Sequence, residues 1–291
     1  MEIWEEIKTS FKEGSYLTRL IYINIAVFVI VQLWNVLIFL TAGEMFSIAS
    51  FLTLPADISQ LIWRPWTLIS YMFLHEGFLH LLFNILWLFW FGKMFLEYFT
   101  EKKLLSVYLL GGLSGGLLYI LAYNVFPVFA NALPYSSALG ASASVMAIVF
   151  AVAFYVPNRS LHLFLIGEIK IKYIAWFLVG LDILSIPSGN AGGHIAHLGG
   201  ALFGYLFIME YKKGNLITKP FDKLIESIFS LFKASPKIKV SYKSTGNKDY
   251  DYNAKKKASQ KEIDKILEKI AKSGYSSLSK EEKEWLFKHG S

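Results

Sequence analysis

Gly140–Ser144 (GASAS) and Gly192–Gly200 (GGHIAHLGG) are the two stretches of this sequence that decide its fold. Each lies near the start of an apolar segment long enough to cross a bilayer. Serine and histidine are costly inside a membrane unless polar partners surround them, so such positions are usually functional. The two stretches therefore predict a polar site inside a membrane protein.

The composition supports the membrane class. Of the 291 residues, 54% are hydrophobic and 16% are aromatic, and the mean hydropathy of +0.43 is too high for an ordinary soluble enzyme. The chain has no cysteine, which excludes disulfides, a thiolate nucleophile and a cysteine-based metal site. Any chemistry must come from serine, histidine, asparagine or carboxylate side chains.

Six apolar segments of roughly membrane-spanning length predict an all-α membrane protein, a bundle of six transmembrane helices. The first loop, residues 42–70, holds Pro55, Trp63 and Trp66 among other apolar residues, so we expect part of it to lie in the membrane interface. The predicted spans cover residues 17–41, 73–95, 104–126, 138–157, 171–187 and 193–211.

Lysine and arginine gather in alternate loops, which orients the chain by the positive-inside rule. The loops on the other side hold a single such residue, Arg64. We therefore expect a multi-pass membrane protein with both termini in the cytoplasm. As its location we expect a bacterial inner membrane. The basic residues on the cytoplasmic side are Lys8, Lys12, Arg19, Lys93, Lys102, Lys103, Arg159, Lys170, Lys172, Lys212 and Lys213.

This orientation brings four polar residues to one depth. The second, fourth and sixth spans all run from outside to inside, and His80 with Asn84, Ser142, and His197 lie near their respective starts. At 1.5 Å of rise per residue, each lies on the order of 5–15 Å below the outer helix ends. We expect these side chains to converge at a site that opens outward.

Serine and histidine at one depth fit nucleophilic catalysis. A serine hydroxyl becomes a good nucleophile when a neutral imidazole removes its proton, roles that Ser142 and His197 can fill. Donors for a developing oxyanion are the Ser142 backbone N–H, the Asn84 amide and the His80 imidazole. No carboxylate is comparably placed, and we interpret Asp182, near the outer end of the fifth span, as an interfacial or structural acid.

Small residues allow the fourth and sixth spans to approach closely. We expect Gly200 and Gly204 on the sixth span to pack against Gly140 and Ala143 on the fourth, because residues without bulky side chains let two helix backbones approach. Taken singly, such a pattern more often reflects packing than catalysis. Its coincidence with the polar residues favours a functional site.

The motifs now resemble those of the rhomboid intramembrane serine proteases, over residues 60–210 and in the same order along the chain. Any one of them is weak, but four in order on a chain with six predicted spans are specific. The matching elements are Trp63-Arg64 in the first loop, His80-Leu-Leu-Phe-Asn84, Gly140-Ala141-Ser142-Ala143, and Ala196-His197-Leu198-Gly199-Gly200 with Gly204.

The resemblance implies that Ser142 is the nucleophile, that His197 is its base and later acid, and that His80 and Asn84 belong to the oxyanion site. It also implies hydrolysis through an acyl-enzyme, transmembrane protein substrates that enter laterally from the lipid, and no metal or organic cofactor. Membrane lipids are the other expected partners.

Three positions depart from the pattern or leave it ambiguous. Ala143 stands where a glycine follows the serine, and Met146 stands where some members carry a tyrosine that packs on the histidine. A methionine can make that contact through its thioether, with a looser histidine as the cost. His194 lies one helical turn before His197, and the sequence context favours His197 as the base.

The segments before and after the predicted membrane domain are polar. Residues 1–16 form an expected cytoplasmic segment before the membrane domain at 17–211. Residues 212–291 hold 19 lysines against 10 acidic residues. We interpret 212–260 as a basic linker with an amphipathic stretch at 221–232, and 261–291 as a small helical cytoplasmic tail with a capping box at 279–282. The basic balance fits a solvated face near anionic lipid better than nucleic-acid binding.

An active intramembrane serine protease is the leading hypothesis. The first alternative is a catalytically silent rhomboid-like protein that binds transmembrane clients, and the intact Ser142, His197, His80 and Asn84 argue against it. The second is a small transporter or channel, which would show internal repeat symmetry or several charged residues at mid-membrane depth. Neither feature is evident in the sequence.

Overall fold

The computed structural model describes residues 3–42, 47–163, 167–232 and 248–289. The chain forms two compact units, residues 1–233 and 234–291, which are described separately below.

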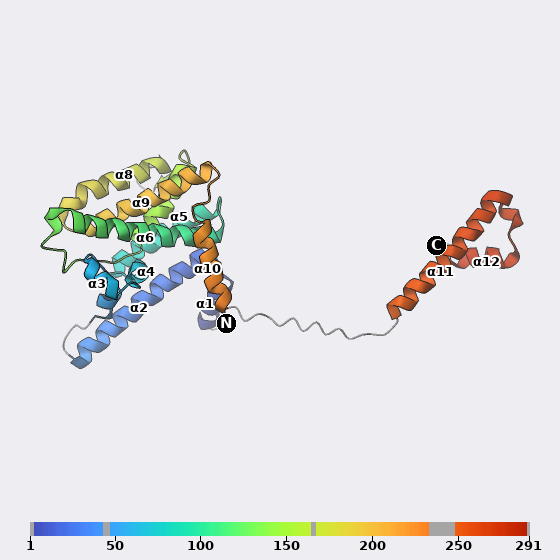
Figure 1. The fold of residues 1–291 in the computed structure, drawn as a ribbon, viewed down its shortest axis with the longest axis horizontal. Helices are drawn as coiled ribbons and strands as arrows, with labels where there is room; N and C mark the ends of the chain where they lie inside the picture. Colours follow the sequence, from blue (N-terminus) through green and yellow to red (C-terminus); the bar gives the residue numbers. More distant parts are fainter. Residues whose placement is uncertain (1–2, 43–46, 164–166, 233–247, 290–291) are drawn as a thin grey trace. The chain divides into compact units, whose positions relative to one another are not determined.

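Long apolar helices dominate the first unit and confirm the predicted all-α membrane class (Figure 1). Within the described residues, five helices are long and apolar enough to cross a membrane. They are α2 (Tyr16–Ala42), α5 (Phe78–Leu96), α6 (Glu101–Val125), α8 (Ile171–Ser185, extended to Ser188 by the 3-10 turn η4, Ile186–Ser188) and α9 (Ala191–Lys212).

The fourth predicted span forms a shorter helix than expected. Helix α7 covers Ser142–Tyr155, so its 14 residues span about 21 Å, less than the roughly 30 Å of a hydrocarbon core. The prediction of helix over residues 138–141 is wrong, because Ala138 pairs with Leu54 of a β-strand and Gly140 has a φ of +128°. The helix therefore begins at Ser142 itself.

Helices α6, α7 and α9 pack on one another at the centre of the unit. Helix α7 is buried continuously from Ala143 to Ala153, while α5 and α8 pack against its sides and α2 packs against α5 and α6. Figure 1 shows α6 and α9 running side by side.

Glycines on α9 make the central packing close. A methyl group at Gly200 would overlap the carbonyl oxygen of Ala143, and one at Gly204 would overlap that of Ala147. Helix backbones approach to this distance only where side chains are absent. Gly115 of α6 similarly leaves room for the methyl group of Ala143, which explains how the fold accommodates alanine after Ser142.

The outer helices expose apolar side chains. Leu40 of α2 is 74% exposed and Leu184 of α8 is 78% exposed. Helices whose apolar residues cover the outside as well as the inside are typical of proteins surrounded by lipid.

From Ser47 onward, the first loop is structured and pairs with the segment that precedes α7. Strand β1 (Leu54–Pro55) pairs antiparallel with β2 (Ser137–Ala138), with Leu54 opposite Ala138. The loop also exposes Ile62 and Trp63. Its other elements are η1 (Ile48–Phe51), α3 (Ile58–Trp63), α4 (Thr67–Ser70) and η2 (Tyr71–Phe73).

Shorter elements complete the first unit. Arg159, just ahead of the hairpin of β3 (Ser160–Leu163) and β4 (Gly167–Lys170), forms an ion pair with Glu97 after α5. Helix α10 (Lys219–Phe232) covers the predicted amphipathic stretch and contacts α6, where Asp222 accepts a hydrogen bond from Ser106. The remaining elements are α1 (Ile3–Glu13) and η3 (Pro127–Phe129).

The second unit is a helical hairpin of α11 (Lys248–Ser273), η5 (Tyr275–Ser277) and α12 (Lys280–His289). The predicted capping box is confirmed, because the Ser279 N–H donates to Glu282 Oε2 at 2.7 Å and the Glu282 N–H donates to Ser279 Oγ at 3.2 Å. Helix α11 begins earlier than the apolar spacing from residue 261 predicts. Its first half is rich in lysine and alanine, which favour helix without an apolar repeat.

Candidate active site

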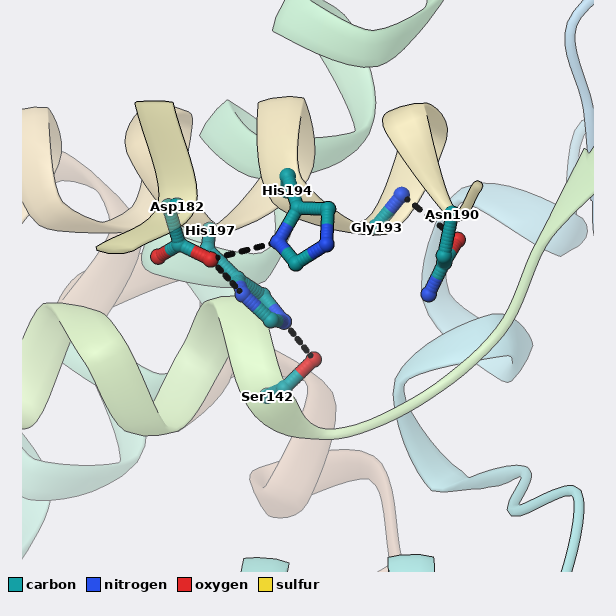
Figure 2. Close-up of polar contacts among 6 residues, drawn as sticks. All are labelled: Ser142, Asp182, Asn190, Gly193, His194 and His197. Atoms are coloured by element: carbon teal, nitrogen blue, oxygen red, sulfur yellow. Dashed lines mark hydrogen bonds and ion pairs between the residues drawn. The ribbon is translucent and has the colours of Figure 1, made fainter. Parts of the chain in front are cut away.

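The site is built around Ser142, the first residue of α7. Its Oγ lies 2.7 Å from Nε2 of His197, which stands in the second turn of α9 (Figure 2). Of the two neighbouring histidines on α9, His197 is thus the one that reaches the serine.

Asp182 completes this chain of contacts. Its Oδ1 lies 2.9 Å from Nδ1 of His197, and the residue is only 7% exposed. The expectation that no carboxylate accompanies the serine and histidine is therefore wrong. Asp182 stands in the last turn of α8, which packs against α9 and brings the carboxylate level with His197. An ionised carboxylate only accepts hydrogen bonds, so the contact with Asp182 favours the tautomer of a neutral His197 that has its proton on Nδ1 and presents the Nε2 lone pair to Ser142.

His194 contacts the same carboxylate oxygen. Its Nδ1 lies 2.8 Å from Asp182 Oδ1, so two imidazoles converge on one atom (Figure 2). At the start of α9, Oδ1 of Asn190 caps the helix by accepting a hydrogen bond from the Gly193 N–H at 3.1 Å.

The segment before α7 fixes the position of Ser142. The Gly140 N–H donates to the carbonyl oxygen of Tyr71 at 2.9 Å. The φ of +128° at Gly140 is one that side chains disfavour, and a methyl group there would lie 3.1 Å from Nε2 of His80. Glycine is therefore required at residue 140 for both the backbone turn and the space beside His80.

His80 and Asn84 stand on the first turns of α5. The Glu76 N–H lies 3.4 Å from Nδ1 of His80, which leaves Nε2 available as a donor. Nδ2 of Asn84 donates to the His80 carbonyl at 2.8 Å and has a second hydrogen to donate. Both side chains line the same cavity as Ser142.

Ser142 lines two cavities. One, of about 460 Å³, extends between α5 and α8 and is lined by apolar side chains such as Trp87 and Leu181 as well as by His197. The other, of about 430 Å³, lies against the 137–140 segment and is also lined by His80 and Tyr71. The side chain of Ser142 therefore borders both an apolar cavity and a more polar one.

The remaining predicted residues divide between the site and the first loop. Met146 lines the larger cavity. Trp63 and Arg64 line neither cavity. Trp63 is 81% exposed, and Arg64 donates to the Ser50 carbonyl at 3.2 Å, so its contacts stabilise the loop.

Among the described residues, Asp182, His194 and His197 form a group whose side chains could hold a metal ion. Their ligand atoms lie within 4.8 Å of one another.

Comparison with known families now identifies the chain. A model of the Rhomboid domain matches residues 62–213, more than half of the sequence. The chain belongs to the rhomboid family. The rhomboid match includes every residue of the site described above.

Curated relatives of this rhomboid protein come from mitochondria and bacteria. RHOMBOID-like protein 12, mitochondrial, of Arabidopsis thaliana is 30% identical over 161 residues, 52% of this chain and 48% of that protein. Presenilin-associated rhomboid-like protein A, mitochondrial, of Danio rerio is 31% identical over 170 residues, 57% and 42% of the two chains. Rhomboid protease GlpG of Haemophilus influenzae is 32% identical over 147 residues, 49% and 67%. The match thus spans about half or less of the first two relatives.

The second unit of this rhomboid protein has a match of its own. Residues 247–290 fit a family of unknown function (DUF6576), a range that contains α11 and α12.

Proposed function

We propose that this rhomboid protein is an intramembrane serine endopeptidase that cleaves transmembrane segments of membrane proteins. The observation that carries the proposal is the line of contacts from Ser142 Oγ through His197 to Asp182, with separations of 2.7 and 2.9 Å. Family membership supports it, since the relative from Haemophilus influenzae is named a rhomboid protease.

In the proposed reaction, Ser142 Oγ attacks a peptide carbonyl carbon while His197 Nε2 takes the hydroxyl proton. Asp182 holds the imidazole in the tautomer that leaves Nε2 free and stabilises the imidazolium that forms. The tetrahedral oxyanion accepts hydrogen bonds from the Ser142 N–H, His80 Nε2 and Asn84 Nδ2.

Collapse of this intermediate gives an acyl-enzyme. His197 returns the proton to the nitrogen of the departing peptide, and the acyl group stays on Ser142. A water molecule, deprotonated by the same imidazole, then attacks the ester and frees the second product. Asp182 thus adds a positioning carboxylate to the predicted catalytic pair of Ser142 and His197.

The substrate path follows from the larger cavity. Its apolar lining between α5 and α8 suits a transmembrane helix that arrives from the lipid, and Ser142 is among the residues that line it. The exposed Ile62 and Trp63 of the first loop suit contact with the membrane interface.

The orientation rests on the loop charges, which favour both termini in the cytoplasm and a site that opens on the opposite side. We propose a bacterial inner membrane as the location, which fits the relative from Haemophilus influenzae. Two of the relatives carry mitochondrial names, so a mitochondrial membrane is the competing location.

Reconstitution tests the proposed activity. The purified protein in liposomes should cleave a model transmembrane substrate, and Ser142→Ala and His197→Ala variants of equal thermal stability should not. Cleavage that survives either substitution would refute the mechanism. Failure of the wild type on several substrates would favour the silent, client-binding alternative.

A further inference from the structure

His194 has no task in the proposed reaction, yet it is as close to Asp182 as His197 is. Nδ1 of each histidine lies 2.8 or 2.9 Å from the same oxygen, Oδ1 of Asp182. All three side chains are shielded, with exposed side-chain fractions of 23% for His194, 24% for His197 and 10% for Asp182. Two imidazole nitrogens and a carboxylate therefore already converge on one point beside the larger cavity.

We propose that Asp182, His194 and His197 form a binding site for a divalent transition-metal cation such as Zn²⁺, and that the bound ion switches the serine off. The ligand set is two imidazoles and one carboxylate, a combination that zinc sites with an open position commonly use. Imidazole ligands also select against Mg²⁺ and Ca²⁺, which prefer oxygen.

The geometry needs only small movements. Ligands about 2.1 Å from a tetrahedral zinc ion lie about 3.4 Å apart, and here the ligand atoms are separated by 2.8 Å, 2.9 Å and at most 4.8 Å. The two short separations must widen by about 0.5 Å, and the separation between the two Nδ1 atoms must shrink by at most about 1.4 Å. Side-chain rotations that move each ligand atom by less than about 1 Å therefore make room for the ion. The fourth position then faces the larger cavity, which all three residues line and which has room for a water ligand.

Metal binding and catalysis need opposite tautomers of His197. Without the ion, Nδ1–H donates to Asp182 and Nε2 offers its lone pair to Ser142. A metal ion needs the lone pair of Nδ1, so the proton of the neutral ring moves to Nε2. Nε2 can then donate to Ser142 Oγ but cannot accept its proton, and the nucleophile stays inactive. This consequence rests on the proposed protease function, whereas metal binding itself does not.

Direct binding tests the site independently of activity. Protein freed of any affinity tag is titrated with ZnCl₂ by calorimetry, and bound zinc is counted after dialysis. His194→Gln keeps a side-chain donor for Asp182 but removes a ligand. His162→Gln, which removes an exposed histidine of β3, is the matched control. Because loss of an outer partner of a ligand already costs about 10–100-fold in affinity, His194→Gln should weaken the tight site by at least about 100-fold and His162→Gln should not.

A second measurement links the ion to the serine. Zinc should block both substrate cleavage and covalent labelling of Ser142 by a fluorophosphonate, and a chelator should restore both. His194→Gln should be labelled at zinc concentrations that block the wild type. Equal zinc binding by wild type and His194→Gln overturns the site. Tight binding through His194 with unchanged labelling overturns the switch. Absence of cleavage in metal-free wild type counts against the proposed function alone, because the zinc titration is still informative.

Discussion

Replacement of Asp182 by asparagine isolates the contribution of the carboxylate that the structure places behind His197. The amide oxygen can still accept one hydrogen bond from Nδ1, but the negative charge opposite the developing imidazolium is lost. A hydrogen bond to a charged group contributes about 1.5–3 kcal/mol, and each 1.36 kcal/mol corresponds to tenfold in rate. We therefore expect kcat to fall by about 10- to 150-fold. KM should stay constant, because the charge acts in the transition state.

The assay is cleavage of a transmembrane substrate in liposomes, with kcat and KM measured separately and the thermal midpoint recorded for each variant. Asp57→Asn is the matched control. Asp57 caps α3 through a 2.8 Å bond from the Ser59 N–H and lines neither cavity. Asparagine caps helices as well as aspartate does. A kcat for Asp182→Asn within twofold of wild type would refute the role assigned to the carboxylate.

Gly200→Ala places a methyl group against the Ala143 carbonyl and should lower the thermal midpoint by several degrees, since overpacking costs about 1–3 kcal/mol. Gly180→Ala places its methyl group in open space and should not lower the midpoint. Equal midpoints for the two variants would contradict the close packing at Gly200. Asn84→Ala should lower kcat by about 10²–10³ as an oxyanion donor is lost; a change confined to KM would assign Asn84 to binding instead. The Arg159 guanidinium holds the pKa of Glu97 below its usual value. This exposed pair contributes about 0.2–1 kcal/mol above the unfolded pKa of Glu97 and loses it as the pH falls through the lowered folded pKa. The midpoints of wild type and Glu97→Gln should thus converge in acid, and a gap that persists there would contradict the assignment.

The apolar segments and the serine and histidine could be found in the sequence because each has a local signal. Runs of apolar residues predict membrane helices, and the alternation of basic loops places Ser142 and His197 at one level. The contact between them, at 2.7 Å, agrees with that placement.

The role of Asp182 is not predictable from the sequence alone, because it depends on the rotation of the helix about its axis. It is the one acidic residue in the fifth predicted span, and its level matched that of the site. Whether its side chain faces α9 or the lipid depends on how α8 packs, which a single sequence does not specify. A lone carboxylate in an apolar span was nevertheless a usable signal, because burial of such a charge needs a polar partner.

The residue at which α7 begins cannot be predicted from local sequence patterns either. The apolar run extends to residue 138, but the backbone there follows a pairing with Leu54 and Pro55, more than 80 positions earlier in the chain. Contacts of such sequence separation leave no periodic pattern. The early start of α11 is not predicted for another reason. A segment with good helix propensity but no apolar repeat looks like a polar linker in the sequence.

The pairing of β1 with β2 has a consequence for how this chain can change during evolution. The backbone that delivers Ser142 is aligned by a loop that supplies no catalytic group, through the Leu54–Ala138 pair and the Tyr71 carbonyl. Insertions within residues 52–57 or 134–141 would shift the register between the two segments and displace the hydroxyl from His197. Substitutions in one segment are therefore expected to be accompanied by compensating substitutions in the other, and a chimera that exchanges the loop alone would retain its helices but lose the alignment of its nucleophile.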